Sequence, residues 1–373
     1  MKSVKRISIT ILANIAVTII LFLMIEGLSS VVIIVKETFF NDVLQERKHT
    51  QYDEEIGWIN EPNLHIEDMY GPGRSFSTNS MAVRSNHETS PSIPAGKIRI
   101  VCSGDSFTMG YGVDTKDGWC QQLESLDNHF ESVNLGQGGY GVDQAYLWYK
   151  RNSTKLEHDI QLFAFITDDF RRMQSDKFQG YGKPFLKVEN AAIVNSNRPV
   201  PRISYVFPRF PLLRDGIGNL NVVKLLQRVV VRVKPAGQTG QVADIQADQQ
   251  DSETRKVVLK IFDDLQKTNR TKDSVFVLVY LPRRPNDSLG KESGPWRDFI
   301  HEASSERGFP IVDLVDEMAK LSPEESVGLY SDNGHYSEKG NLIAAQLLYK
   351  QLLALPAVSA KLQQKHVPAL VNP

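Results

Sequence analysis

The sequence is poor in cysteine and carries almost no net charge. Its only two cysteines, Cys102 and Cys120, are too few for a disulfide framework or a cysteine-based zinc site. We expect both to be small buried hydrophobic side chains, with a disulfide between them as the alternative. The 43 basic and 44 acidic residues give a net charge of −1, and no block of Lys and Arg with interleaved aromatics occurs. This balance argues against a nucleic-acid partner.

The sequence also lacks internal repeats and a pattern typical of metal ligands. Seven of the eight histidines show no ligand spacing, and we interpret them as surface or structural residues. These are His49, His65, His87, His129, His158, His301 and His366. We therefore expect neither a metal nor a cofactor.

One long uncharged apolar run, Ile7–Ile25, stands near the N-terminus. As a helix it would be about 28 Å long, close to the hydrocarbon thickness of a bilayer. Three basic residues precede it: Lys2, Lys5 and Arg6. We predict a membrane anchor over 1–36, with a cytoplasmic N-terminus and an extracytoplasmic body, in the periplasm or at the cell surface. A cleaved signal peptide, with Gly27 and Ser29 near the cleavage site, is the alternative.

The composition changes again after this anchor. Residues 37–96 are polar and then rich in turn formers. We interpret 37–60 as a helical or loose stalk, followed by a β-rich lead-in and a proline-containing linker over 87–96. The main domain is expected to span 97–355, and residues 356–373 to form a tail.

Apolar strand patterns alternate with helical patterns through the main domain. The expected strands are Ile98–Cys102, Glu131–Asn134, Ile160–Ile166, Ser274–Tyr280 and Pro310–Val312. The expected helices are Asp117–Leu126, Val142–Asn152, Asp251–Lys267, Trp296–Arg307 and Glu338–Leu355. This alternation predicts an α/β fold with a flavodoxin-like, doubly wound, five-stranded parallel sheet covered by helices on both faces.

A long insertion over about 171–250 interrupts this alternation after the third strand. It contains several prolines and one apolar helix candidate, Val222–Val233. Its position at the carboxyl edge of the sheet favours a role in shaping a substrate cleft, and packing elsewhere is the alternative. We expect Gly237–Gln250, which is rich in Gln, Gly and Ala, to be mobile.

A short motif, Gly104-Asp105-Ser106, follows the first expected strand. It stands at the carboxyl end of a buried parallel strand, where such sheets place their ligands. Gly104 allows a sharp turn, so the Ser106 hydroxyl can face a cleft as a candidate nucleophile. Because most such tripeptides are surface turns, this assignment depends on the other motifs.

A second motif lies directly before the last expected helix. Asp332 and His335 stand three residues apart on a loop, so both side chains can point into one cleft. A serine hydroxyl needs a base at neutral pH, and that base needs an orienting group. The pair predicts His335 as the general base for Ser106, with Asp332 as its orienting carboxylate.

Glycines and acidic residues follow the second and third expected strands. The stretch Asn134–Gly139 offers backbone N–H groups that can approach a ligand closely, as an oxyanion hole requires. An ordinary strand-to-helix turn is the alternative. The third strand ends in Thr167-Asp168-Asp169, which by itself is typical of a solvated strand end.

Together these four motifs resemble the GDSL/SGNH hydrolase superfamily over about 97–355. The resemblance implies that Ser106 is the nucleophile, His335 the general base and Asp332 its orienting partner. It also implies that the N–H groups of Ser106 and Gly139 are oxyanion donors. The lead-in residues Gly57, Trp58, Asn79, Ser80 and Arg84 additionally resemble membrane-anchored bacterial SGNH proteins, which are often associated with surface polysaccharides.

The third motif departs from the family pattern. Family members usually carry Gly-x-Asn-Asp, in which the Asn side chain is an oxyanion donor, whereas this chain places Asp168 at the Asn position. An ionised carboxylate would repel the developing oxyanion, and a protonated one could donate a hydrogen bond. Asp168 is thus a donor with a shifted pKa, a substrate-binding carboxylate or a sign of weakened catalysis. Asp169 is a candidate for substrate binding.

The resemblance implies a membrane-anchored, extracytoplasmic serine esterase of the carboxylesterase or acetylesterase kind. Its expected substrate is an O-acyl ester, above all an O-acetyl ester, on a surface or exported polysaccharide. We expect contacts with an acylated carbohydrate and with the membrane, and none with nucleic acid. The alternatives are an O-acyltransferase that acts on a glycan, and a carbohydrate-binding or assembly protein with reduced catalysis.

Overall fold

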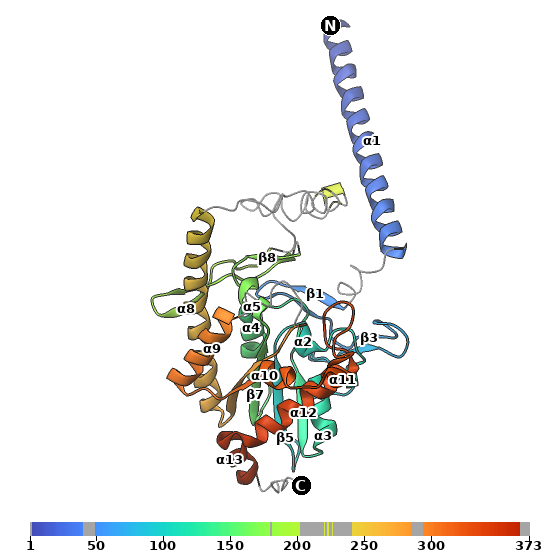
Figure 1. The fold of residues 1–373 in the computed structure, drawn as a ribbon. Helices are drawn as coiled ribbons and strands as arrows, with labels where there is room; N and C mark the ends of the chain where they lie inside the picture. Colours follow the sequence, from blue (N-terminus) through green and yellow to red (C-terminus); the bar gives the residue numbers. More distant parts are fainter. Residues whose placement is uncertain are drawn as a thin grey trace.

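A five-stranded, fully parallel sheet forms the centre of the computed structural model (Figure 1). Its strands are β5 (Ile98–Ser103), β6 (Phe130–Asn134), β7 (Ile160–Phe165), β12 (Val275–Tyr280) and β13 (Ile311–Asp313). They lie in the order β13-β12-β7-β5-β6, which is the order of flavodoxin-like sheets. The predicted fold class is therefore confirmed. The structure describes residues 2–39, 49–179, 181–201, 220, 222–223, 226, 241–284 and 294–365.

Helices cover both faces of this sheet, and each face buries its own hydrophobic core. The helices on one face are α4 (Val142–Ser153), α8 (Gln241–Thr271) and α9 (Gly294–Arg307). Those on the other are α3 (Trp119–Leu126), α10 (Leu314–Ala319), α12 (Glu338–Ala354) and α13 (Pro356–Gln364). The central strands β5 and β7 are buried along their whole length, because a parallel sheet with two covered faces exposes neither side.

Three boundaries differ from the sequence predictions. Helix α8 begins at Gln241, ten residues before the predicted start at Asp251, whereas the expected mobility of this stretch stays a prediction. The expected tail begins with α13, whose Val358 and Leu362 are buried in the core. The expected stalk gives way to strand at Thr50. The helix candidate over 222–233 falls almost entirely outside the described residues.

Short antiparallel hairpins occur in the lead-in and in the described part of the insertion. The lead-in contains β1 (Thr50–Asp53) with β2 (Gly57–Asn60), and β3 (His65–Ile66) with β4 (Phe76–Ser77). The insertion contains β8 (Lys177–Phe178) with β9 (Tyr181–Gly182), and β10 (Leu186–Glu189) with β11 (Ala192–Asn195). The two regions are joined at Val200, whose carbonyl accepts a hydrogen bond from the Tyr52 hydroxyl at 2.6 Å.

The N-terminal segment forms one helix, α1 (Lys2–Phe39). Its stretch Thr10–Val32, with a mean hydropathy of 2.3, is long and apolar enough to cross a bilayer. A signal sequence near the N-terminus can meet the same criteria of length and hydropathy.

Cys102 and Cys120 form a disulfide between β5 and α3, with a Cα–Cα distance of 6.3 Å. Both residues are fully buried. The expectation of two separate thiols is thus wrong, and the alternative of a disulfide is confirmed. The bond joins the strand that carries the Ser106 motif to the helix packed against it.

Candidate active site

The turn after β5 fixes Ser106 at the carboxyl edge of the sheet. Ser106 is the first residue of α2 (Ser106–Met109), and Asp105 caps this helix by accepting a hydrogen bond from a first-turn N–H. A Cβ atom on Gly104 would lie only 2.2 Å from Thr108 Oγ1. Glycine is therefore required before the helix, and the turn points Ser106 away from the strand.

His335 contacts Ser106 although 229 residues separate them in the chain. Its Nε2 atom lies 2.8 Å from Ser106 Oγ. The imidazole packs between two aromatic rings, with centroid distances of 4.9 Å to Phe107 and 4.6 Å to Tyr111. The structure thus brings together the predicted nucleophile and the predicted base, in hydrogen-bond geometry.

The surroundings of His335 keep its imidazole uncharged. Burial is the main cause that lowers its pKa, the Asp105 carboxylate opposes this effect, and the guanidinium groups of Arg172 and Arg283 add to it. The resulting pKa is about 4. A neutral imidazole at pH 7 can take the Ser106 proton, so the pair can act as nucleophile and general base.

The partner of the other imidazole nitrogen is Asn333. Its Oδ1 atom lies 3.2 Å from His335 Nδ1, and it also accepts hydrogen bonds from the His335 N–H and the Ser331 hydroxyl. Because an amide oxygen only accepts, Nδ1 carries the proton and Nε2 accepts from Ser106. Asp332 is exposed in the same turn and, within the described part of the chain, makes no hydrogen bond to His335. Its orienting role stays a prediction.

The glycine-rich loop after β6 lies against the serine turn. The Gln137 N–H donates to the Gly104 carbonyl at 3.2 Å. Gly139 has a φ of +75°, and a Cβ atom there would lie 2.6 Å from a ring carbon of Phe178, so this position also requires glycine. The loop is close enough to serve the nucleophile, and oxyanion donation by the N–H groups of Ser106 and Gly139 stays a prediction.

Asp168, in the first turn of α5 (Thr167–Arg172), forms an ion pair with Arg283. Asp168 Oδ2 lies 2.8 Å from Arg283 Nη1, and the two side chains are 20% and 25% exposed. The other carboxylate oxygen, Oδ1, is buried and has no hydrogen-bond partner among the described residues. Since arginine cannot accept a hydrogen bond, the Asp168 oxygen that faces it is an acceptor. This geometry gives no support to Asp168 as a proton donor.

Asp169 is only 2% exposed, and both of its oxygens have protein partners. Oδ1 lies 2.7 Å from Arg172 Nη1, and Oδ2 accepts a hydrogen bond from the Ile166 N–H. Burial raises the pKa of Asp169 well above its usual range, and the nearby Asp105 carboxylate raises it further. Substrate binding by Asp169 stays a prediction, while its observed contacts are those of a structural residue.

Arg172 joins three parts of the site, and the sequence analysis missed it. Its Nη1 atom contacts Asp105 Oδ2 at 3.2 Å and the Tyr140 carbonyl at 2.9 Å, in addition to Asp169. It thereby links the serine turn, the glycine-rich loop and α5. The three-residue spacing from Asp169 was a signal that could have identified it, because residues i and i+3 of a helix are neighbours.

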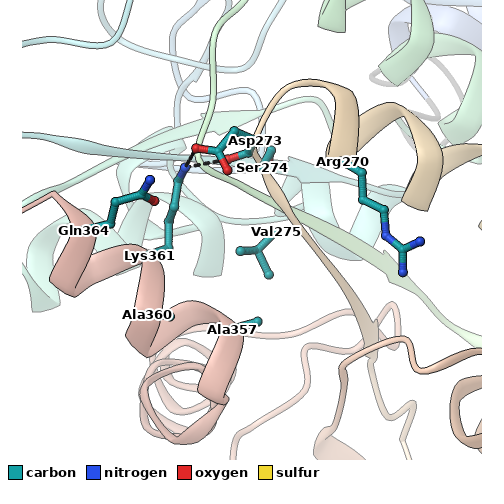
Figure 2. Close-up of a pocket in the computed structure, with 8 residues that line it drawn as sticks. All are labelled: Arg270, Asp273, Ser274, Val275, Ala357, Ala360, Lys361 and Gln364. Carbon is teal, nitrogen blue, oxygen red and sulfur yellow. Dashed lines mark hydrogen bonds and ion pairs between the residues drawn. The ribbon is translucent and has the colours of Figure 1, made fainter.

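A separate surface pocket of about 440 Å³ lies at the opposite edge of the sheet (Figure 2). Its lining includes Ser274 and Val275 at the beginning of β12 and Lys361 on α13. The Lys361 amino group lies 2.7 Å from Asp273 Oδ2, so its charge is paired. Because Ser106 lies beyond the carboxyl ends of the strands, this pocket is not part of the candidate active site.

No family model and no curated protein matches the sequence. Among solved structures, the chain is similar to a member of the lipolytic protein G-D-S-L family from Veillonella parvula DSM 2008, with 12% identity and a TM-score of 0.37 over 69% of this chain and 98% of that one. The psychrotrophic esterase EstA from Pseudoalteromonas sp. also has 12% identity and a TM-score of 0.37, over 68% of this chain and 96% of that one. The lipase/acylhydrolase from Enterococcus faecalis has 12% identity and a TM-score of 0.36, over 68% and 95%.

Proposed function

We propose that this chain is a serine ester hydrolase of the SGNH type. The observation that carries the proposal is the 2.8 Å contact between Ser106 Oγ and His335 Nε2, made by an imidazole whose pKa is lowered to about 4. Both groups lie at the carboxyl edge of a parallel sheet, where such folds bind their ligands. The order of the four sequence motifs supports the same assignment.

In the proposed reaction, His335 Nε2 takes the Ser106 proton while Oγ attacks the ester carbonyl carbon. The oxyanion that forms accepts hydrogen bonds from the N–H groups of Ser106 and Gly139. The imidazolium then gives its proton to the leaving alcohol oxygen as the ester bond breaks, and an acyl-enzyme remains. Water, deprotonated by His335, attacks this acyl group, and the carboxylic acid leaves as Ser106 regains its proton.

The proposed substrate is an O-acyl ester, above all an O-acetyl ester, on a surface or exported polysaccharide. The proposed location is a single-pass membrane protein with its catalytic domain outside the cytoplasm. Two features support this location. The apolar stretch Thr10–Val32 follows a basic N-terminus, which favours a cytoplasmic start, and the Cys102–Cys120 disulfide is typical of oxidising compartments.

Two observations favour a second candidate function, a glycan-binding protein with weak catalysis. The position of the usual asparagine donor holds Asp168, and the His335 Nδ1 atom faces an amide of Asn333 in place of a carboxylate. The first feature reduces the stabilisation of the negative oxyanion, and the second reduces the stabilisation of the positive imidazolium. A sugar hydroxyl that replaces water in the second step would make the same site an O-acyltransferase.

The test uses the full chain in detergent with p-nitrophenyl acetate as substrate and an acid quench followed by intact-mass measurement. The wild type is expected to release p-nitrophenol and to gain one acetyl group on Ser106. Ser106→Ala is expected to lose both signals, and His335→Ala to lose most of the turnover. If the folded wild type shows neither turnover nor labelling by a serine-directed phosphonate, the hydrolase proposal is rejected in favour of the binding protein. An added oligosaccharide that becomes acetylated would identify the transferase.

A further inference from the structure

Three neighbouring strands bring Ser106, Asp168 and Arg283 to one edge of the sheet. Strands β5, β7 and β12 are adjacent in the sheet. Ser106 begins the helix after β5, Asp168 lies in the first turn after β7, and Arg283 follows the end of β12 by three residues. The ends of β7 and β12 are also linked directly, because the Thr167 and Tyr280 hydroxyls lie 2.5 Å apart.

The backbone around Arg283 is fixed to the loop that carries His335. The Tyr330 hydroxyl donates to the Arg283 carbonyl at 3.1 Å, and the Tyr336 hydroxyl donates to the Pro282 carbonyl at 2.8 Å. These two tyrosines flank His335 in the sequence and form a β-bridge with each other. The Arg283 charge reaches the imidazole, since it lowers the pKa of His335. The backbone at Arg283 is thus fixed to the loop that carries His335.

Asp168 fixes the direction of the Arg283 side chain. The 2.8 Å ion pair is made by one guanidinium nitrogen, and the five N–H donors of a guanidinium let it serve several acceptors at once. The side chain remains 25% exposed. A carboxylate by itself beside the nucleophile would repel the oxyanion of an ester reaction, but a carboxylate that orients an arginine presents a positive group to it.

We propose that Arg283, oriented by Asp168, donates a hydrogen bond to the oxyanion that forms when Ser106 attacks an ester. The inference rests on the proposed hydrolase function and deepens it. Arg283 is then a catalytic residue and Asp168 a positioning residue, and together they take the place of the asparagine donor. No covalent bond to Arg283 forms or breaks. The guanidinium stabilises the negative charge on the carbonyl oxygen until the C=O double bond forms again.

The first test measures kcat and KM of the full chain in detergent with p-nitrophenyl acetate. In Arg283→Ala, kcat should fall about 10²–10³-fold, the usual effect of removing one oxyanion donor. KM should change little, because the hydrogen bond strengthens only in the transition state. Arg151→Ala is the matched control, since Arg151 pairs with Asp53, has a side chain 26% exposed and lies in the last turn of α4. It should keep the wild-type kcat.

A rescue experiment separates donation from simple packing. Asp168→Asn in the Arg283→Ala background supplies a neutral amide donor at the same position and should restore kcat by at least about tenfold. Asp168→Ala in the same background removes the repulsion without adding a donor and should restore less. Arg283→Ala with wild-type kcat would overturn the proposal. A raised KM at unchanged kcat would also overturn it, because that result describes a substrate anchor.

The second readout is the rate at which a p-nitrophenyl phosphonate labels Ser106, measured only on variants that unfold cooperatively on heating. Arg283→Ala should label about 10²-fold more slowly than the wild type. If the wild type is active and Arg283→Ala labels at the same rate, the role of Arg283 is rejected while the hydrolase proposal stands. A wild type that neither labels nor turns over rejects the serine chemistry itself, and the role of Arg283 with it.

Discussion

His335 is the residue whose surroundings decide the pH range of the proposed reaction. Burial lowers its pKa to about 4, and the base form of the imidazole is the active one. We therefore predict that kcat/KM is level around neutral pH and is lost only as the pH falls through about 4. A pH–rate profile of kcat/KM with p-nitrophenyl acetate checks this. An acidic limb near the ordinary histidine value of about 6.5 would contradict the buried geometry.

The same profile can detect the charge of Arg283. The guanidinium lowers the pKa of His335, so its removal in Arg283→Ala should raise that pKa. The acidic limb of kcat/KM should then move to higher pH, in addition to the loss of kcat. An unmoved limb would show that the arginine and the imidazole do not interact in solution.

The orientation of His335 gives a prediction that compares two adjacent residues. Asn333 Oδ1 accepts from Nδ1 in the structure, whereas Asp332 is exposed in the same turn. Asn333→Ala should lower kcat by about 10²-fold, because the imidazole loses the group that sets its tautomer. Asp332→Ala should have a much smaller effect on kcat. The opposite ranking would assign the orienting role to Asp332, as the sequence motif implies.

Sequence reasoning found the two reacting side chains because their chemistry is tied to short motifs. Ser106 and His335 each stand beside a strand end or helix start that the apolar pattern reveals. Asn333 and Arg283 were missed because their roles depend on which atoms meet in space. The sequence places an aspartate three residues before His335, and only the turn geometry shows that the intervening asparagine makes the contact.

At the scale of elements, one buried ion pair attaches the insertion to the sheet helices. Lys183, in the insertion, pairs with Asp143 at the start of α4, and both side chains are almost fully buried. The Lys183 amino group also contacts the Ser175 and Pro184 carbonyls. Burial raises the pKa of Asp143 and lowers that of Lys183, so neither charge would be stable here without the other. The pair fixes the insertion beside the glycine-rich loop.

We predict that Lys183→Met lowers the free energy of unfolding by about 3–5 kcal/mol, the usual cost of leaving one buried charge unpaired. Urea unfolding of the full chain in detergent measures it. Lys256→Met is the control, because Lys256 and Glu253 form an exposed pair with side chains 61% and 67% accessible, which contributes at most about 1 kcal/mol. Equal effects of the two substitutions would show that the insertion is not held by this pair.

Apolar periodicity predicted every strand of the central sheet, because each runs through the core. It was less successful where polar residues take part in packing. Arg99 lies fully buried in β5 and binds Glu131 and the carbonyls of Pro91 and Ser92, which holds the expected linker against the sheet. Helix α8 extends into the Gln-rich stretch before Asp251, which the sequence pattern did not assign to a helix.

At the scale of the whole molecule, the parallel topology explains why separate motifs form one site. The chain places β5 between β6 and β7, and β12 next to β7. All of their carboxyl ends therefore meet at one edge, where a doubly wound sheet binds its ligands. The sequence order of strands and helices was sufficient to predict this edge, but not the ion pair between Asp168 and Arg283, which joins segments 115 residues apart.

The Cys102–Cys120 disulfide links the fold to a compartment. The two residues are 18 positions apart, and closing a loop of about that length stabilises a protein by about 3 kcal/mol. Cytoplasmic proteins are normally kept reduced. The disulfide and the apolar helix α1 therefore both lead us to expect that the domain is exported.

We predict that the full chain, made in growing cells and quenched with acid, gains no mass from a thiol-reactive maleimide under denaturing conditions until it is reduced. After reduction it should gain two labels, one for each cysteine. A chain that lacks residues 1–36, and with them the proposed anchor, is the control; it should stay in the reducing compartment and gain both labels directly. Two labels on the unreduced full chain would show that the domain is not exposed to an oxidising compartment. The proposed location outside the cytoplasm would then lose its support. The proposal of a surface or exported polysaccharide as substrate would lose its support with it.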